Sequence, residues 1–206
     1  MDEAVQVRLA VNGRGHAWTV GPPPADVGPA DTLAHTLRHV LGLTGTKVSC
    51  DRGACGMCTV LMDGRPVLSC TLLTVECDGA DVVTVEGLAD PVTGELHPLQ
   101  QAFVDHTAFQ CGYCTPGILM SAKALLDENP APTTADVQEA LAGNHCRCIT
   151  HYHVLEAVQD AAGRMRAAVP GSAGVAAGSV SPGAPGAAEP SAGALPAAAR
   201  AAGKPR

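Results

Sequence analysis

Short runs in which hydrophobic and polar residues alternate dominate the first third of the chain. Residues 5–11 alternate strictly, which predicts a half-buried strand. The apolar face of this run consists of Val5, Val7, Leu9 and Val11. Asn12-Gly13 is a hairpin signal, and residues 17–20 read as the returning strand, with Arg14-Gly15 expected to lengthen the turn.

A helix and a second hairpin follow. Apolar residues at helical spacing predict a helix over residues 33–41, with Asp31 as its N-cap and Gly42 at its end. Residues 59–62 and 65–68 read as two strands joined by an Asp63-Gly64 turn. Residues 82–85 are then predicted to form the last strand of the sheet.

From His97 onward the period of the pattern becomes helical. A first apolar face runs to His106, and Pro116-Gly117 starts a second helix that reaches Leu125. Thr133 and Asp136 resemble a capping box before a third helix, which Gly143 can end. A fourth apolar face runs from Val154 to Met165. The pattern therefore predicts four helices, with connecting turns at residues 111–114 and 146–148.

Composition and charge exclude several classes of partner. The formal net charge is −7 and no basic cluster occurs, which argues against nucleic acid and anionic membranes as partners. No apolar run approaches the ~20 residues that a membrane span needs. The acidic start, Met1-Asp2-Glu3, has no apolar segment after it that would indicate a signal peptide. We therefore expect a cytoplasmic protein without a membrane span.

Eight of the nine cysteines fall into two sets. The first set is Cys50, Cys55, Cys58 and Cys70. Its spacing of four and then two intervening residues, with a distant fourth cysteine, is the plant-type 2Fe–2S pattern. Gly53 and Gly56 suit a loop that wraps closely around a cluster, because a Cβ atom would obstruct it. The second hairpin would carry Cys70 back beside Cys58.

The second set is Cys111, Cys114, Cys146 and Cys148, with 31 residues between its two halves. Structural zinc is an alternative for either set, and more so for the second, since paired CxxC motifs often hold zinc. Disulfides are a further alternative, although they are typical of shorter, secreted chains. Cys77 is left over and is expected to be a semi-buried free thiol.

These patterns together indicate an α+β protein. Residues 1–86 are predicted to form a β-grasp, ferredoxin-like 2Fe–2S domain, and residues 87–166 an all-α, four-helix 2Fe–2S-binding domain. Residues 167–206 consist largely of Ala, Gly, Pro and Ser without periodicity, which predicts a disordered tail.

The chemistry expected of such a chain is electron transfer. Clusters held only by cysteine carry single electrons and leave no coordination position open for a substrate. We find no catalytic constellation of side chains in the sequence, so we predict no catalytic residue and no substrate site.

Five stretches lie in or near the two cysteine sets. They are Gly45-Thr46-Lys47-Val48-Ser49-Cys50, Cys55-Gly56-Met57-Cys58-Thr59-Val60, Leu96-His97-Pro98-Leu99-Gln100-Gln101-Ala102-Phe103, Gln110-Cys111-Gly112-Tyr113-Cys114-Thr115-Pro116-Gly117 and Asn144-His145-Cys146-Arg147-Cys148. These stretches resemble a known family, the small iron–sulfur subunits of the molybdenum hydroxylases, and the resemblance covers residues 5–163. The family includes xanthine dehydrogenase, aerobic carbon monoxide dehydrogenase, and isoquinoline and aldehyde oxidoreductases.

The resemblance implies a larger enzyme complex with partner subunits. A large subunit would hold molybdopterin, and an FAD-binding subunit or another acceptor would receive the electrons. The helical cluster would come first in this path and the ferredoxin-like cluster second. Gln110 matches the family glutamine that lies against the pterin, although an ordinary helix-end glutamine is the simpler interpretation of that residue alone.

Other interpretations remain open at this point. A free-standing two-cluster ferredoxin would need the same cysteines. A protein-interaction module stabilised by bound zinc would need them too. His145, His151 and His153 lie close to cysteines, but we expect them to face the surface or a subunit rather than bind metal. Gly13-Arg14-Gly15 begins no dinucleotide-binding motif, because no third glycine or helix follows it.

Overall fold

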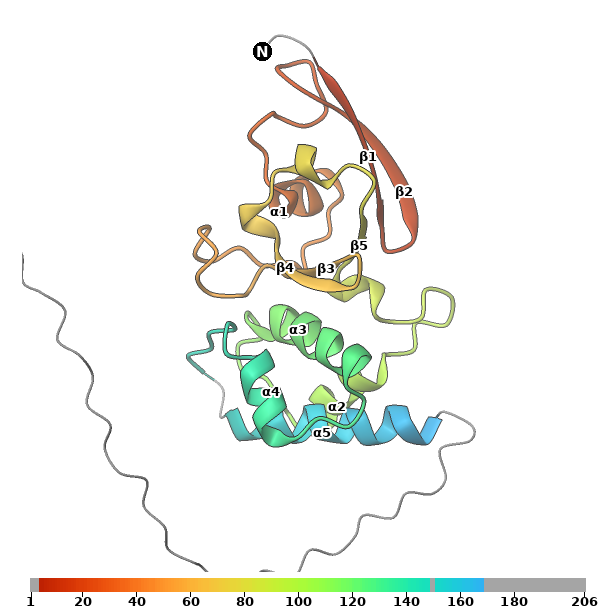
Figure 1. Ribbon diagram of the computed structural model, residues 1–206, viewed down its shortest axis with the longest axis vertical. Helices are drawn as coiled ribbons and strands as arrows, with labels where there is room; N and C mark the ends of the chain where they lie inside the picture. The colour runs from red at the N-terminus through yellow and green to blue at the C-terminus, as the bar shows by residue number, and fades with distance from the viewer. Residues whose placement is uncertain (1–3, 149–150, 169–206) are drawn as a thin grey trace, which may run out of the picture. The chain divides into compact units, whose positions relative to one another are not determined.

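A five-stranded mixed sheet forms the N-terminal part of the protein (Figure 1). The computed structural model describes residues 4–148 and 151–168. The strands are β1 (Val5–Val11), β2 (Arg14–Val20), β3 (Thr59–Met62), β4 (Arg65–Leu68) and β5 (Asp81–Val83). Their order is β2-β1-β5-β3-β4, and only the β1–β5 pair is parallel.

The first hairpin is tighter than predicted. Val11 pairs directly with Arg14, so that the turn consists of Asn12 and Gly13 alone. Both residues have positive φ, 51° and 74°, which is the conformation that matches the twist of a two-residue hairpin. The expectation that Arg14-Gly15 lengthens this turn is wrong, because both residues belong to β2.

The helix that covers the sheet is short and changes its type. Helix α1 (Leu33–His35) continues into a π-helical turn, η1 (Thr36–Val40). Its N-cap is Thr32, whose hydroxyl accepts the His35 N–H at 3.3 Å. The prediction of Asp31 as N-cap is wrong, because the Asp31 carboxylate instead accepts the Gly28 N–H at 2.7 Å.

The sheet buries one continuous apolar face. Val7, Leu9 and Val11 are buried there, whereas Val5 at the start of β1 is half exposed. Leu33 and Leu37 from the helix pack into the same cluster. Strand β5 ends at Val83 rather than Val85, because the Thr84 N–H is bound by the Asn12 side chain at 2.8 Å.

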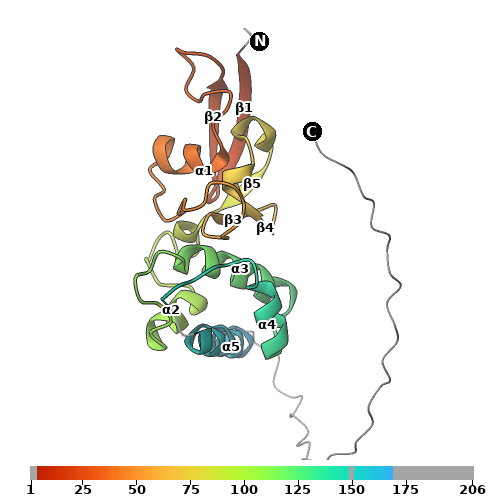
Figure 2. The ribbon, with the colours of Figure 1, turned by 90° about the vertical axis from the view of Figure 1, so that its left-hand side faces the viewer.

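Four α-helices lie in the C-terminal part of the described chain, after η4 (Val85–Gly87) (Figure 2). They are α2 (Pro98–Asp105), α3 (Thr115–Glu128), α4 (Thr134–Ala140) and α5 (His151–Ala168). The capping box predicted at Thr133 is present: the Thr133 hydroxyl accepts the Asp136 N–H, and the Asp136 carboxylate accepts the Thr133 N–H. Helix α4 ends at Ala140, before Gly143, so the predicted stop lies too far along the chain.

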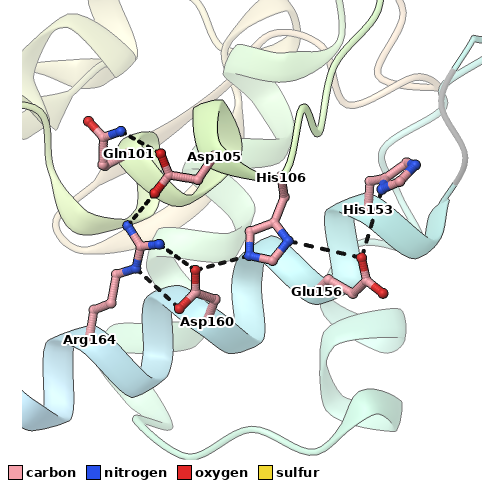
Figure 3. A network of polar contacts seen from close by, with 7 residues as sticks. All are labelled: Gln101, Asp105, His106, His153, Glu156, Asp160 and Arg164. Atoms are coloured by element: carbon pink, nitrogen blue, oxygen red, sulfur yellow. Dashed lines mark hydrogen bonds and ion pairs between the residues drawn. The ribbon is translucent and has the colours of Figure 1, made fainter.

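A polar network fastens α2 to α5 (Figure 3). Arg164 binds Asp105 at 2.7 Å and Asp160 at 2.6 Å, and Asp160 also lies 3.0 Å from His106 Nε2. The remaining members of the network are Gln101, Glu156 and His153.

The sheet and the helices share apolar packing. Leu61 from β3 belongs to the same buried cluster as Phe103 from α2 and Met120 from α3. The described residues accordingly fall into one compact unit. The boundary between residues 86 and 87 stays a prediction. The tail was predicted over residues 167–206, but residues 167–168 belong to α5, and the rest of it lies outside the described residues. Among the described residues, no helix is both long and apolar enough to cross a bilayer.

Candidate metal centres

The first cysteine set is assembled by a loop and a hairpin. The loop places Cys50, Cys55 and Cys58 before β3, and the β3–β4 hairpin returns the chain to Cys70. Asp51, Gly53 and Gly56 have φ values of 50°, 71° and 72°, so the loop curls through the left-handed region repeatedly. The expectation that the hairpin brings Cys70 beside Cys58 is met, since the two thiols are hydrogen-bonded.

The four sulfurs of this set lie in two pairs. Cys50 is hydrogen-bonded to Cys55 on the more exposed side, and Cys58 to Cys70 on the buried side. Backbone N–H groups of Arg52 and Ala54 lower the pKa of Cys50 to about 6, and the Ala54 nitrogen lies 3.2 Å from the Cys50 sulfur. Burial raises the pKa of Cys58 to about 11. Cys58 therefore needs a bound cation to become thiolate at neutral pH.

The second set shows the same pairing. The sulfurs of Cys111 and Cys148 are 3.7 Å apart and exposed, while Cys114 is hydrogen-bonded to Cys146. The backbone N–H of Tyr113 lowers the pKa of Cys111, whereas burial raises that of Cys114 to about 12. Cys114 is the residue immediately before α3, and this helix therefore starts at the site.

Pairs of sulfurs fit a binuclear cluster. A 2Fe–2S cluster held by cysteine takes two thiolates on each iron, which matches four sulfurs divided two and two. A single zinc ion would instead draw four ligands to one point. Within residues 4–148 and 151–168, no three His, Cys, Asp or Glu side chains converge on a common ion position.

The two sets are joined directly. The His145 backbone N–H donates to the Cys55 carbonyl oxygen at 3.0 Å, and the Asn144 side chain donates to the Gly56 carbonyl at 2.9 Å. Tyr113 adds a third bridge through its hydroxyl, which donates to the Val48 carbonyl at 2.7 Å. The loop that carries Cys146 is therefore anchored on the loop that carries Cys55.

Glycines allow this close contact. A Cβ atom on Gly56 would collide with the Gly143 carbonyl, and one on Gly117 with the Gly56 carbonyl. The first turn of α3 thus lies backbone to backbone against the first cysteine loop. Sequence reasoning assigned Gly56 to the cluster loop but missed this contact, and it missed Asn144 and Tyr113 as bridges, because nothing in their spacing marks them.

The other predicted residues occupy varied places. Gln110 is exposed beside the exposed Cys111. Cys77 is 1% exposed and so fully buried rather than semi-buried, with its thiol 3.4 Å from the Leu73 carbonyl. His145 and His153 are exposed, as expected, and the side chain of His151 lies outside the described residues.

Comparison with known proteins gives consistent matches over the described chain. Residues 33–106 match a 2Fe–2S iron–sulfur cluster binding domain, and residues 84–159 match a [2Fe–2S] binding domain. The nicotine 6-hydroxylase small subunit of Paenarthrobacter nicotinovorans is 48% identical over 163 residues, which covers 79% of this chain and 93% of that protein.

Two solved structures extend the comparison. Quinoline 2-oxidoreductase from Pseudomonas putida 86 matches with a TM-score of 0.72 and 39% identity, over 80% of this chain and 98% of the matched chain. The aldehyde oxidoreductase from Desulfovibrio desulfuricans ATCC 27774 matches with a TM-score of 0.71 and 42% identity. In this case 79% of the present chain corresponds to only 17% of a much longer chain.

Proposed function

The chain belongs to the family of small iron–sulfur subunits of the molybdenum hydroxylases, and we propose that it carries single electrons through two 2Fe–2S clusters. The electrons would come from a molybdopterin site in a partner large subunit and leave to an FAD-binding subunit or another acceptor. When bound, each cluster accepts and releases one electron at a time. This chain would thus serve an oxidoreductase complex without a substrate site of its own.

The observation that carries the proposal is the pairing of sulfurs at both sites. We assign Cys50, Cys55, Cys58 and Cys70 to one cluster, and Cys111, Cys114, Cys146 and Cys148 to the other. In each set one pair is more buried than the other: Cys58 and Cys70 are both buried in the first set, and Cys114 is buried in the second. This arrangement favours two binuclear clusters over zinc, and it leaves Cys77 without a role as ligand.

The backbone bridge between the two sets supports electron transfer between them. Cys146 is bonded to His145, whose N–H donates to the carbonyl of Cys55 at 3.0 Å. One hydrogen bond and a few covalent bonds therefore join a proposed ligand of one cluster to a proposed ligand of the other. We propose that this contact fixes the distance between the two sites and keeps water out of the space between them.

The exposed face of the second set is the proposed entry point. Cys111 and Cys148 are exposed, and Phe109 and Tyr113 beside them are 39% and 43% exposed. Apolar rings around exposed sulfurs favour a face that a partner covers. We propose that the molybdopterin subunit covers this face and that Gln110 lies against the pterin, as the family resemblance implies.

The relatives support a partner, because one is named a small subunit and another carries the matching region as a part of a long chain. We also propose the division into a β-grasp domain over residues 1–86 and a helical domain from residue 87 to the end of α5 at Ala168, followed by a tail. The cytoplasmic location stays a prediction.

Iron and acid-labile sulfide analysis of the full-length protein tests the proposal. We expect about four of each per chain and a red-brown protein with visible absorption. About two of each, or a colourless protein that contains zinc, would refute it. When this chain is purified from the cells that produce it naturally, a large molybdenum-containing subunit should co-purify with it. If no such subunit ever associates with the chain, the chain is a free-standing ferredoxin.

A further inference from the structure

One buried hydroxyl lacks a partner. The Thr115 side-chain oxygen exposes less than 1 Å² and has no hydrogen-bond partner, and it is the sole buried side-chain nitrogen or oxygen in this condition in the described part of the chain. Buried polar groups are nearly always hydrogen-bonded, because their removal from water is otherwise uncompensated. The partner of Thr115 is therefore something other than the residues that the structure describes.

The position of Thr115 points to what that partner is. It follows Cys114 directly and opens α3, and Gly117 two residues later touches the backbone of Gly56 and Met57. The hydroxyl thus lies in the first turn of a helix that begins directly after Cys114 and contacts the first cysteine loop through Gly117. Pro116, the next residue, has no N–H that could donate to a neighbouring acceptor.

The first cysteine set has a hydroxyl in a comparable place. Ser69 precedes Cys70, donates to the Cys58 carbonyl at 2.7 Å and lies within hydrogen-bonding reach of the Cys58 thiol. The sulfur atoms there also receive backbone N–H groups, such as that of Ala54. Hydrogen bonds to cluster sulfurs are one of the terms that set reduction potentials.

We propose that the Thr115 hydroxyl donates a hydrogen bond to a sulfur of the cluster held by Cys111, Cys114, Cys146 and Cys148, and that this bond raises the reduction potential of that cluster. The inference rests on the proposed function, because it needs the cluster to be present. The bond favours the reduced form, which carries the extra negative charge. Thr115 is therefore a positioning residue that acts on the cluster without being one of its ligands.

The test compares variants of the full-length, iron-loaded protein as isolated. Thr115→Val removes the hydroxyl at nearly constant shape, Thr115→Ser keeps it, and Thr93→Val in the exposed 90–97 loop is the control. Potentiometric titration followed by electron paramagnetic resonance reports the two clusters separately. We expect Thr115→Val to shift the reduction equilibrium of one cluster about tenfold toward the oxidised form, about 59 mV for one electron.

Further outcomes decide between the interpretations. Thr115→Ser and the control should keep both wild-type potentials, and an exchangeable deuteron coupled to the reduced cluster in D₂O should disappear in Thr115→Val. If Thr115→Val assembles its clusters poorly, the reduction potentials of Thr115→Ala and Thr115→Ser provide the same comparison, without and with the hydroxyl. If the wild-type protein shows two cluster signals and Thr115→Val leaves both reduction potentials unshifted, the inference is overturned. A buried water would then be the partner of the hydroxyl. A wild-type protein with fewer than two signals would instead overturn the proposed function.

Discussion

His145 donates its backbone N–H to the backbone carbonyl oxygen of Cys55, across 3.0 Å and 90 positions of sequence. Each of these residues belongs to, or adjoins, a different cysteine set. Because both groups are backbone atoms, no substitution other than His145→Pro removes the contact directly. The neighbouring side chain of Asn144 and the glycines that allow the approach are the parts of this bridge that mutation can test.

Loss of a single proposed ligand should remove a single cluster. Cys114→Ser is expected to abolish one of two 2Fe–2S signals and to reduce the iron content from about four to about two per chain, because serine binds iron poorly in a site shaped for thiolate. Cys58→Ser should remove the other signal. If both electron paramagnetic resonance signals survive in Cys114→Ser, the second ligand set is assigned wrongly.

Asn144 should hold the second cysteine loop in place. Asn144→Ala removes the hydrogen bond to Gly56 and is expected to lower the free energy of unfolding by about 1 kcal/mol. The variant should also lose iron to a chelator faster, because the loop that carries Cys146 is less firmly anchored. Gln159→Ala, which removes a side-chain bond on the exposed face of α5, is the matched control. Equal chelation rates in the two variants would contradict this role.

Gly117 should tolerate no side chain. In Gly117→Ala the new Cβ atom would collide with the Gly56 carbonyl and lie 3.0 Å from Met57 Cα, and neither backbone atom can move freely. Overpacking of this kind costs about 1–3 kcal/mol, and we expect a lower melting temperature together with loss of iron. Gly163→Ala is the control, since nothing lies within 4 Å there and α5 should gain about 0.5–1 kcal/mol. Similar melting temperatures for the two variants would refute the close contact.

The network between α2 and α5 should make stability depend on acid pH. The Arg164 guanidinium lowers the pKa of Asp160, and Gln101 together with Arg164 lowers that of Asp105. Since these carboxyl groups bind protons less readily in the folded chain, their contribution is complete above the ordinary Asp pKa of 3.8 and is lost as the pH falls through the lower folded values.

Arg164→Met therefore should flatten the loss of stability as the pH falls below about 3.8, and it should lower the stability at pH 7 only slightly, because solvent screens these partly exposed groups. Urea unfolding at a series of pH values measures both effects. Arg65→Met, at an exposed position on β4, provides the comparison. An unchanged pH slope in Arg164→Met would show that other carboxylates control the acid transition.

Cys77 should behave as a core residue and not as a ligand. Burial raises the pKa of its thiol to about 11, so we expect no alkylation by iodoacetamide at pH 8 until the protein is unfolded. Cys77→Ala should keep the full iron content and lower the free energy of unfolding by about 1 kcal/mol. Loss of either cluster signal in this variant would contradict the assignment.

Local patterns predicted the elements of the fold well. The bounds of β1, β3 and β4 match the prediction because strict alternation and the Asp63-Gly64 turn are signals contained in a few neighbouring residues. The N-cap at Thr32 and the early end of β5 could not be predicted in this way. Both depend on hydrogen bonds made by particular side chains, Asp31 with Gly28 and Asn12 with Thr84.

The cysteine spacing indicated the two sets, but it could not indicate how they meet. Contacts such as Asn144 with Gly56 join residues 88 positions apart, and no local period encodes them. The orphaned hydroxyl of Thr115 is likewise invisible in sequence, since a threonine after a cysteine usually finds a backbone acceptor. These contacts arise from packing between distant segments, and only the folded chain reveals them.

Leu61 lies on a strand of the sheet, yet it is buried in the cluster formed by the helices. Cutting the chain after the last strand would uncover this side chain and the surface around it, and the fragment would be prone to self-association. Neither half can therefore be expected to survive as an independent redox protein. Selection would therefore act on the two halves together and not on each half by itself.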